Sequence, residues 1–105
     1  MNRETVLMNQ IMAALAGTCR LFRINVGKFK TSDGRFISTG VPAGFSDLFG
    51  VRISDGRAVF IEVKTESGKP TTKQKKFLAA MLDCGALTGI ARSIEEAKQI
   101  VGGSE

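Results

Sequence analysis

The segment that most restricts the fold is RAVFIEVK, at residues 57–64. Alternate side chains of an extended strand point to opposite faces. One face carries Ala58, Phe60, Glu62 and Lys64, and the other carries Val59, Ile61 and Val63. Both faces begin apolar, which is typical of a central strand covered on both sides. The chain therefore needs a sheet with packed layers above and below it.

The other periodic segments predict the elements around this strand. Helical spacing of apolar residues predicts helices over 3–16, 71–85 and 93–103. Alternating or short apolar runs predict strands over 19–27, 46–53 and 86–92. The turn Asp55-Gly56 predicts an antiparallel hairpin, and the later β-α-β passage predicts a right-handed parallel crossover. We expect an α/β fold with a mixed sheet flanked by helices.

Three expectations concern individual side chains. The strand at 19–27 is expected to have its apolar face on Phe22, Ile24 and Val26. The helix at 71–85 is expected to point Phe77, Leu78, Met81 and Leu82 inward. The polar segment 28–40 predicts a surface hairpin that turns at Ser32-Asp33-Gly34, with Phe29 opposite Phe36.

Length and cysteine content predict a small domain in a reducing compartment. The 105 residues predict one domain over 1–105, and no apolar run is long enough to cross a membrane. The first ten residues lack the apolar core of a signal peptide. We therefore expect Cys19 and Cys84 to be reduced, buried packing residues of a cytoplasmic protein.

Absent residue types exclude several kinds of catalytic site. The chain has no histidine, tyrosine or tryptophan. Ser-His and Cys-His nucleophile pairs, His-ligated zinc sites and tyrosine nucleophiles are therefore excluded. An enzyme built from this sequence has carboxylates, Lys, Arg, amides and a hard metal ion to work with, and we expect no organic cofactor.

Three charged side chains are expected to meet at the ends of two strands. The hairpin at Asp55-Gly56 brings Asp47 close to Glu62, which shares a face with Lys64. Two adjacent carboxylates repel each other, and Mg²⁺ or Mn²⁺ relieves that repulsion, with the Val63 carbonyl as a further oxygen ligand. Taken singly, Asp47 is also explained as a turn residue, and Glu62 with Lys64 as a surface ion pair.

Basic side chains follow the same strand and the predicted hairpin. The net charge is +5, which favours a polyanionic partner such as nucleic acid. Candidate phosphate contacts are Lys28, Lys30 and Arg35 in the hairpin and Lys69 and Lys73 after the strand. The alternative is that these residues form merely solvated faces.

Longer motifs give the sequence a specific resemblance. G-F-S-D at 44–47 and E-V-K at 62–64 resemble the PD-(D/E)xK nuclease superfamily. The run FIEVKTESGKPTTKQKKF at 60–77, followed by IARSIEEA at 90–97, resembles the VRR-NUC family more closely. The proline familiar before the aspartate is replaced here by Ser46. The resemblance covers nearly the whole chain and is least clear over 27–41.

This resemblance implies a restriction-endonuclease-like core (α-β-β-β-α-β-α) and a set of roles. Asp47, Glu62 and the Val63 carbonyl would bind the metal, and Glu4 would contact it directly or through water. Lys64 would orient the attacking water, and Gln74 would help to place Lys64 or the water. It also implies a homodimeric endonuclease acting on four-way (Holliday) DNA junctions. The alternatives are a flap or restriction-like nuclease and a non-catalytic nucleic-acid-binding module.

Overall fold

The computed structural model describes residues 2–26 and 28–102, and for Lys28 and Phe29 it describes the backbone only. The helices are α1 (Arg3–Ala14), α2 (Thr72–Asp83) and α3 (Ile94–Gly102). The strands are β1 (Cys19–Arg23), β2 (Lys28–Lys30), β3 (Phe36–Ser38), β4 (Leu48–Arg52), β5 (Ala58–Val63) and β6 (Leu87–Ala91). Within these residues no helix is long and apolar enough to cross a membrane.

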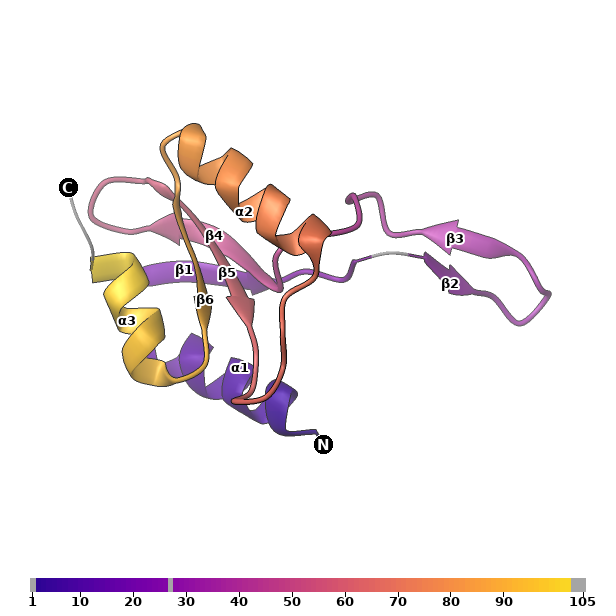
Figure 1. Cartoon of the computed structure of the whole chain (residues 1–105), viewed down its shortest axis with the longest axis horizontal. Helices are drawn as coiled ribbons and strands as arrows, with labels where there is room; N and C mark the ends of the chain where they lie inside the picture. The colour runs from indigo at the N-terminus through magenta and orange to yellow at the C-terminus, as the bar shows by residue number, and fades with distance from the viewer. Residues whose placement is uncertain (1, 27, 103–105) are drawn as a thin grey trace.

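Four strands form one mixed sheet in the order β1-β4-β5-β6. The β1/β4 and β4/β5 pairs are antiparallel, and β5 and β6 run parallel. Helix α2 covers one face, while α1 and α3 pack together on the other (Figure 1). The predicted mixed sheet between helices is therefore confirmed, with β5 as a central strand.

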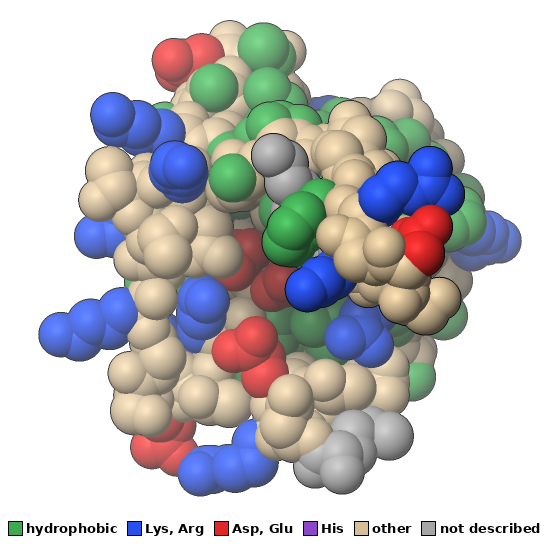
Figure 2. Space-filling model, turned by 90° about the vertical axis from the view of Figure 1, so that its right-hand side faces the viewer, with side chains coloured by type: hydrophobic (Ala, Val, Ile, Leu, Met, Phe, Trp, Pro, Cys, Tyr) green, Lys and Arg blue, Asp and Glu red, His purple; other side chains and the backbone are tan. Residues whose placement is uncertain are grey.

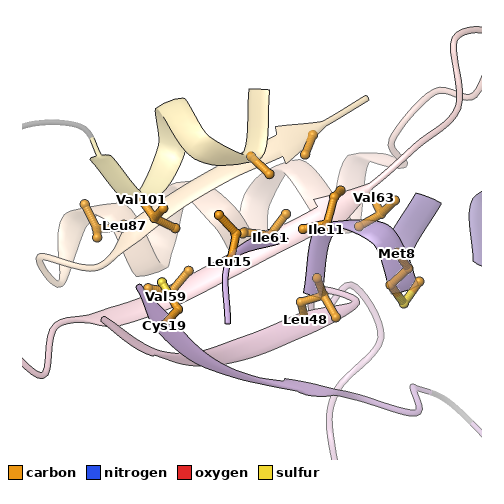
Figure 3. Close-up of a cluster of buried hydrophobic side chains, with 12 residues drawn as sticks. Met8, Ile11, Leu15, Cys19, Leu48, Val59, Ile61, Val63, Leu87 and Val101 are labelled. Atoms are coloured by element: carbon orange, nitrogen blue, oxygen red, sulfur yellow. The ribbon is translucent and has the colours of Figure 1, made fainter. Parts of the chain in front are cut away.

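The larger core lies between the sheet and the α1/α3 layer. Ile11, Leu48, Val59, Ile61 and Val63 are fully enclosed, because alternate residues of β4 and β5 meet the apolar side of α1 (Figure 3). A smaller core beneath α2 is built around Phe60, Leu78 and Ala86. Burial of β5 on both faces is the physical reason for its apolar start.

Three side-chain expectations were wrong. Phe22 is 61% exposed, and Cys19 and Leu21 provide the core-facing side of β1 instead. Strand β1 is at the edge of the sheet, where α2 does not cover it, so its larger apolar face stays outside. Leu82 is 57% exposed because the buried stripe of α2 is narrower than predicted. Cys84, expected to be buried, is exposed.

The predicted surface hairpin is confirmed, with a different register. β2 and β3 form their own two-stranded sheet, which projects from the body (Figure 1). The Thr31 N–H donates to the Arg35 carbonyl, so the turn spans five residues. Lys30 consequently lies opposite Phe36, and Phe29 lies opposite Ile37. The expected Phe29–Phe36 pair was one residue out of register. We call β2, the turn and β3 (residues 28–38) the arm.

Candidate active site

Asp47 and Glu62 meet at the adjoining ends of β4 and β5. The last paired rung is Leu48 opposite Ile61, which places Asp47 and Glu62 one residue further along. The Val63 N–H donates to Asp47 Oδ2 at 2.9 Å, and the Asp47 N–H donates to Glu62 Oε1 at 3.2 Å. Each carboxylate is thus held by the backbone of the opposite strand, which fixes both in one place.

The loop before Asp47 is held against α2. Gly44 has φ +95°, and a Cβ built there would lie 2.6 Å from the Lys73 carbonyl oxygen, so this position requires glycine. The Phe45 ring packs 4.5 Å from the ring of Phe77, measured between centroids. The buried Ser46 hydroxyl donates to the Leu48 carbonyl at 2.8 Å, in the position where the related motif has proline. These contacts fix the start of β4 and therefore the Asp47 carboxylate.

Glu62 is a buried acid with an unfavourable charge. Its side chain is 1% exposed, and desolvation, followed by the charge of Asp47, raises its pKa to about 7. The ammonium of Lys64 opposes that rise, with Nζ 3.4 Å from Glu62 Oε2. When Asp47 and Glu62 are both ionised, their two negative charges exceed the single positive charge of Lys64. This excess of negative charge favours binding of a cation.

A cavity of about 470 Å³ opens beside Asp47. Glu4 from α1 lines this cavity together with Asp47, and so do Val26 and Thr39 at the two ends of the arm. The Thr39 hydroxyl is buried without a hydrogen-bond partner among the described residues. Figure 2 shows acidic side chains in a hollow of this face, with Lys and Arg side chains around it.

The described residues contain no cluster of three or more Asp, Glu or Cys side chains that could hold a metal ion. Glu4 thus shares the cavity with Asp47 but does not join Asp47 and Glu62 as a third ligand in this arrangement. The two held carboxylates nevertheless fit a hard divalent cation, because they supply adjacent anionic oxygens in a buried setting.

Gln74 has a structural task at the start of α2. Its side-chain oxygen accepts from the Thr71 N–H at 2.8 Å, and its own N–H donates to the Thr71 hydroxyl. This capping box fixes the first turn of α2 next to Gly44. The side-chain oxygen of Gln74 is thereby used in the cap of α2.

The candidate phosphate contacts fall into two groups. Lys69 and Lys73 are exposed next to the site, at the end of the loop after Lys64 and in the first turn of α2. Lys30 and Arg35 are exposed on the arm, where Arg35 Nε lies 3.1 Å from Asp33 Oδ2. The Lys28 side chain lies outside the described residues.

Arg92 holds the loop that follows Lys64, a role that the sequence analysis did not predict. Its Nη1 donates to the carbonyls of Thr65 and Gly68, both at 2.6 Å, and so ties down the loop that follows Lys64. The Ser93 hydroxyl accepts from the Glu96 N–H at 3.1 Å, and the Glu96 carboxylate accepts from the Arg92 N–H at 2.7 Å, which fixes the start of α3. The sequence signals at this position were the Arg92-Ser93 pair before the last helix and the Ile90-Ala91-Arg92 motif, and neither reveals a contact 24 to 27 residues away.

Comparisons with known proteins agree with this architecture. A solved structure described as a VRR_NUC domain superposes with a TM-score of 0.68 over 100% of both chains, at 18% sequence identity. No match was found among curated proteins. The family model of the VRR-NUC domain matches residues 6–95, a span that includes Asp47, Glu62 and Lys64 and begins just after Glu4. The chain therefore belongs to the VRR-NUC family and has a nuclease-type fold.

Proposed function

We propose that the protein is a divalent-metal-dependent endonuclease that hydrolyses phosphodiester bonds of DNA. The observation that carries this proposal is the mutual backbone anchoring of Asp47 and Glu62 at 2.9 and 3.2 Å, with the Lys64 ammonium 3.4 Å from Glu62. A buried carboxylate with a second acid beside it costs stability unless it binds something. A cation supplies that compensation.

Asp47, Glu62 and the Val63 carbonyl are the groups we assign to Mg²⁺ or Mn²⁺. Glu4 lies on the wall of the same cavity as Asp47, which suits a contact through water better than direct ligation. When bound, the ion supplies Lewis acidity and lowers the pKa of a coordinated water. The protein's own contribution is to hold its acids rigidly, through the backbone of β4 and β5 and the Phe45 loop.

Lys64 is assigned to the phosphate. Phosphodiester hydrolysis builds negative charge on the phosphate oxygens, and a nearby ammonium in a partly enclosed site stabilises that charge. The Lys64 side chain is 15% exposed, so its charge is poorly screened by solvent. Gln74 is assigned to orienting Lys64 or the attacking water through its Nε2 amide, because its oxygen is held by Thr71.

The substrate we propose is branched DNA, cut by a homodimer. Exposed lysines beside the site and on the arm provide sequence-independent phosphate contacts. Two copies related by a two-fold axis would present two active sites, as symmetric cutting of a four-way junction requires. Sedimentation velocity over a concentration series tests the dimer, and a single species of about 11 kDa, the mass of one chain, would exclude it.

The deciding experiment incubates the protein with labelled four-way junction, flap and linear duplex DNA. Each substrate is tested with Mg²⁺, with Mn²⁺ and with a chelator. The proposal expects cleavage only with metal, fastest on the junction, and none by Asp47→Asn. Preferred cutting of flap or linear DNA would reassign the substrate within the same chemistry. Salt-sensitive binding with no cleavage under any condition would identify a non-catalytic binding module.

A further inference from the structure

The arm exposes apolar surface that the fold does not use. β2 and β3 pair only with each other among the described strands. Phe36 is 70% exposed and Ile37 is 44% exposed, although both are large apolar side chains. An isolated two-stranded hairpin is marginally stable in water, and exposed apolar groups of this kind mark contact surfaces. The arm therefore has the character of a binding element.

The base of the arm forms part of the candidate active site. Val26, just before the arm, and Thr39, just after it, line the cavity that also contains Asp47 and Glu4. The arm extends outward from that rim (Figure 1), and Figure 2 views the molecule from this side. A polynucleotide with one phosphate at Asp47 consequently has its neighbouring nucleotides beside the arm.

The chemistry of the arm fits nucleic acid better than an apolar protein surface. Lys30 lies directly opposite Phe36, so the cation and the aromatic ring share one face of the ribbon. Arg35 lies just before Phe36, at the end of the turn, and its side chain is 81% exposed. An aromatic ring stacks on a base of any sequence, and adjacent cations contact its phosphates. This pairing is typical of binding to unstacked nucleotides.

We propose that the arm is a wedge for branched DNA, in which Phe36 stacks on an unpaired or branch-point base and Lys30 contacts the neighbouring phosphate. This inference rests on the proposed function for its choice of substrate. It assigns the preference for branched over continuous duplex DNA to residues outside the metal site. Stacking needs a base free of its neighbour, which a branch point provides and an intact duplex does not.

A single introduced tryptophan gives a direct test. Because the chain has no tryptophan or tyrosine, Phe36→Trp creates an isolated fluorophore on the arm. Phe22→Trp is a matched control, since Phe22 is 61% exposed but lies on β1 in the main sheet. In the presence of a chelator, four-way junction DNA should strongly quench the tryptophan fluorescence of Phe36→Trp and should quench that of Phe22→Trp only slightly. Equal quenching, or none at 36, would overturn the proposal.

Alanine variants then measure the contribution to binding. Phe36→Ala should weaken junction binding by about tenfold or more, while Phe22→Ala leaves it unchanged, as expected for the loss of one stacked base. Binding to linear duplex should change little in either variant. An equal loss on duplex and junction would refute the branch preference. A change in sedimentation mass without a change in DNA affinity would show a self-association surface and also overturn the proposal.

This test separates the wedge from the nuclease. All binding measurements are made without metal, so they do not depend on catalysis. A protein that never cleaves DNA but shows Phe36-dependent junction binding would lose the nuclease assignment and keep the wedge. A protein that cleaves junctions with Phe36→Ala as well as with the parent, and binds them equally, would keep the nuclease and lose the wedge.

Discussion

Replacing Glu62 by glutamine is expected to stabilise the metal-free protein while abolishing its activity. The Glu62 side chain is 1% exposed, and its carboxyl pKa rises from 4.5 to about 7 on folding. A pKa raised in the folded state means that the folded protein holds the proton more tightly than the unfolded chain does. Stability is therefore lost as pH rises from about 4.5 to about 7, and the loss is complete above that window.

The size of the effect follows from the shift. A rise from 4.5 to about 7 corresponds to roughly 3 kcal/mol of lost folding free energy at alkaline pH. Glutamine has nearly the same shape, and its Oε1 can still accept from the Asp47 N–H, but it carries no charge. Allowing for the loss of the contact with Lys64, we expect Glu62→Gln to be more stable than the parent by roughly 1–3 kcal/mol at about pH 8.

The assay is urea unfolding in chelator at about pH 5 and pH 8, with matched protein concentrations. The advantage of Glu62→Gln should be small at about pH 5, where the parent's Glu62 is protonated in the folded state, and largest at about pH 8. Added Mg²⁺ or Mn²⁺ should stabilise the parent and not the variant. A variant that is less stable than the parent at about pH 8, or a difference that does not depend on pH, would refute the reasoning about this buried charge.

Four further outcomes are expected. Asp47→Asn should keep the fold, because the amide oxygen still accepts from the β5 backbone. The variant should show no metal binding in calorimetry, and its cleavage rate should fall about a hundredfold or more. Metal affinity equal to that of the parent would remove Asp47 from the ligand set. Lys64→Met should keep metal affinity and lose cleavage by about a hundredfold or more, and undiminished cleavage would exclude Lys64 from the chemistry. Lys30→Gln should weaken DNA binding and reduce its salt slope by about 1, measured by fluorescence anisotropy; an unchanged slope would show that the side chain meets no phosphate. Gly44→Ala should lower the free energy of unfolding in urea by about 1–3 kcal/mol, because the added Cβ would clash with the Lys73 carbonyl and the φ of +95° disfavours alanine. An unaltered urea midpoint would contradict that packing.

The pattern of the central strand made much of the fold predictable. The two apolar faces of RAVFIEVK predicted packed layers above and below the sheet, and β5 is buried by a hydrophobic core on each face. The turn Asp55-Gly56 set the pairing of β4 with β5, which brings Asp47 to Glu62. These features follow from the two-residue period of a strand and from short-range turn chemistry, and both are local properties of the sequence.

Other features depended on partners far away in the chain. The exposure of Phe22 was decided by how far α2 reaches across the sheet, and the local pattern of β1 pointed the other way. The tie between Arg92 and the loop after Lys64 depends on the parallel pairing of β5 with β6. The charge state of Glu62 depends on burial and on Asp47, which belongs to another strand.

The sequence by itself therefore determined which residues are candidates for the site: Asp47, Glu62 and Lys64 follow from strand period and turn position alone. The tertiary structure decided how they are held, which acid is buried, and that Glu4 shares the cavity without completing a three-group cluster. It also decided that the arm extends from the rim of that cavity. The physical reason is that periodicity is set by neighbours along the chain, whereas burial, charge and access are set by groups that meet only after folding.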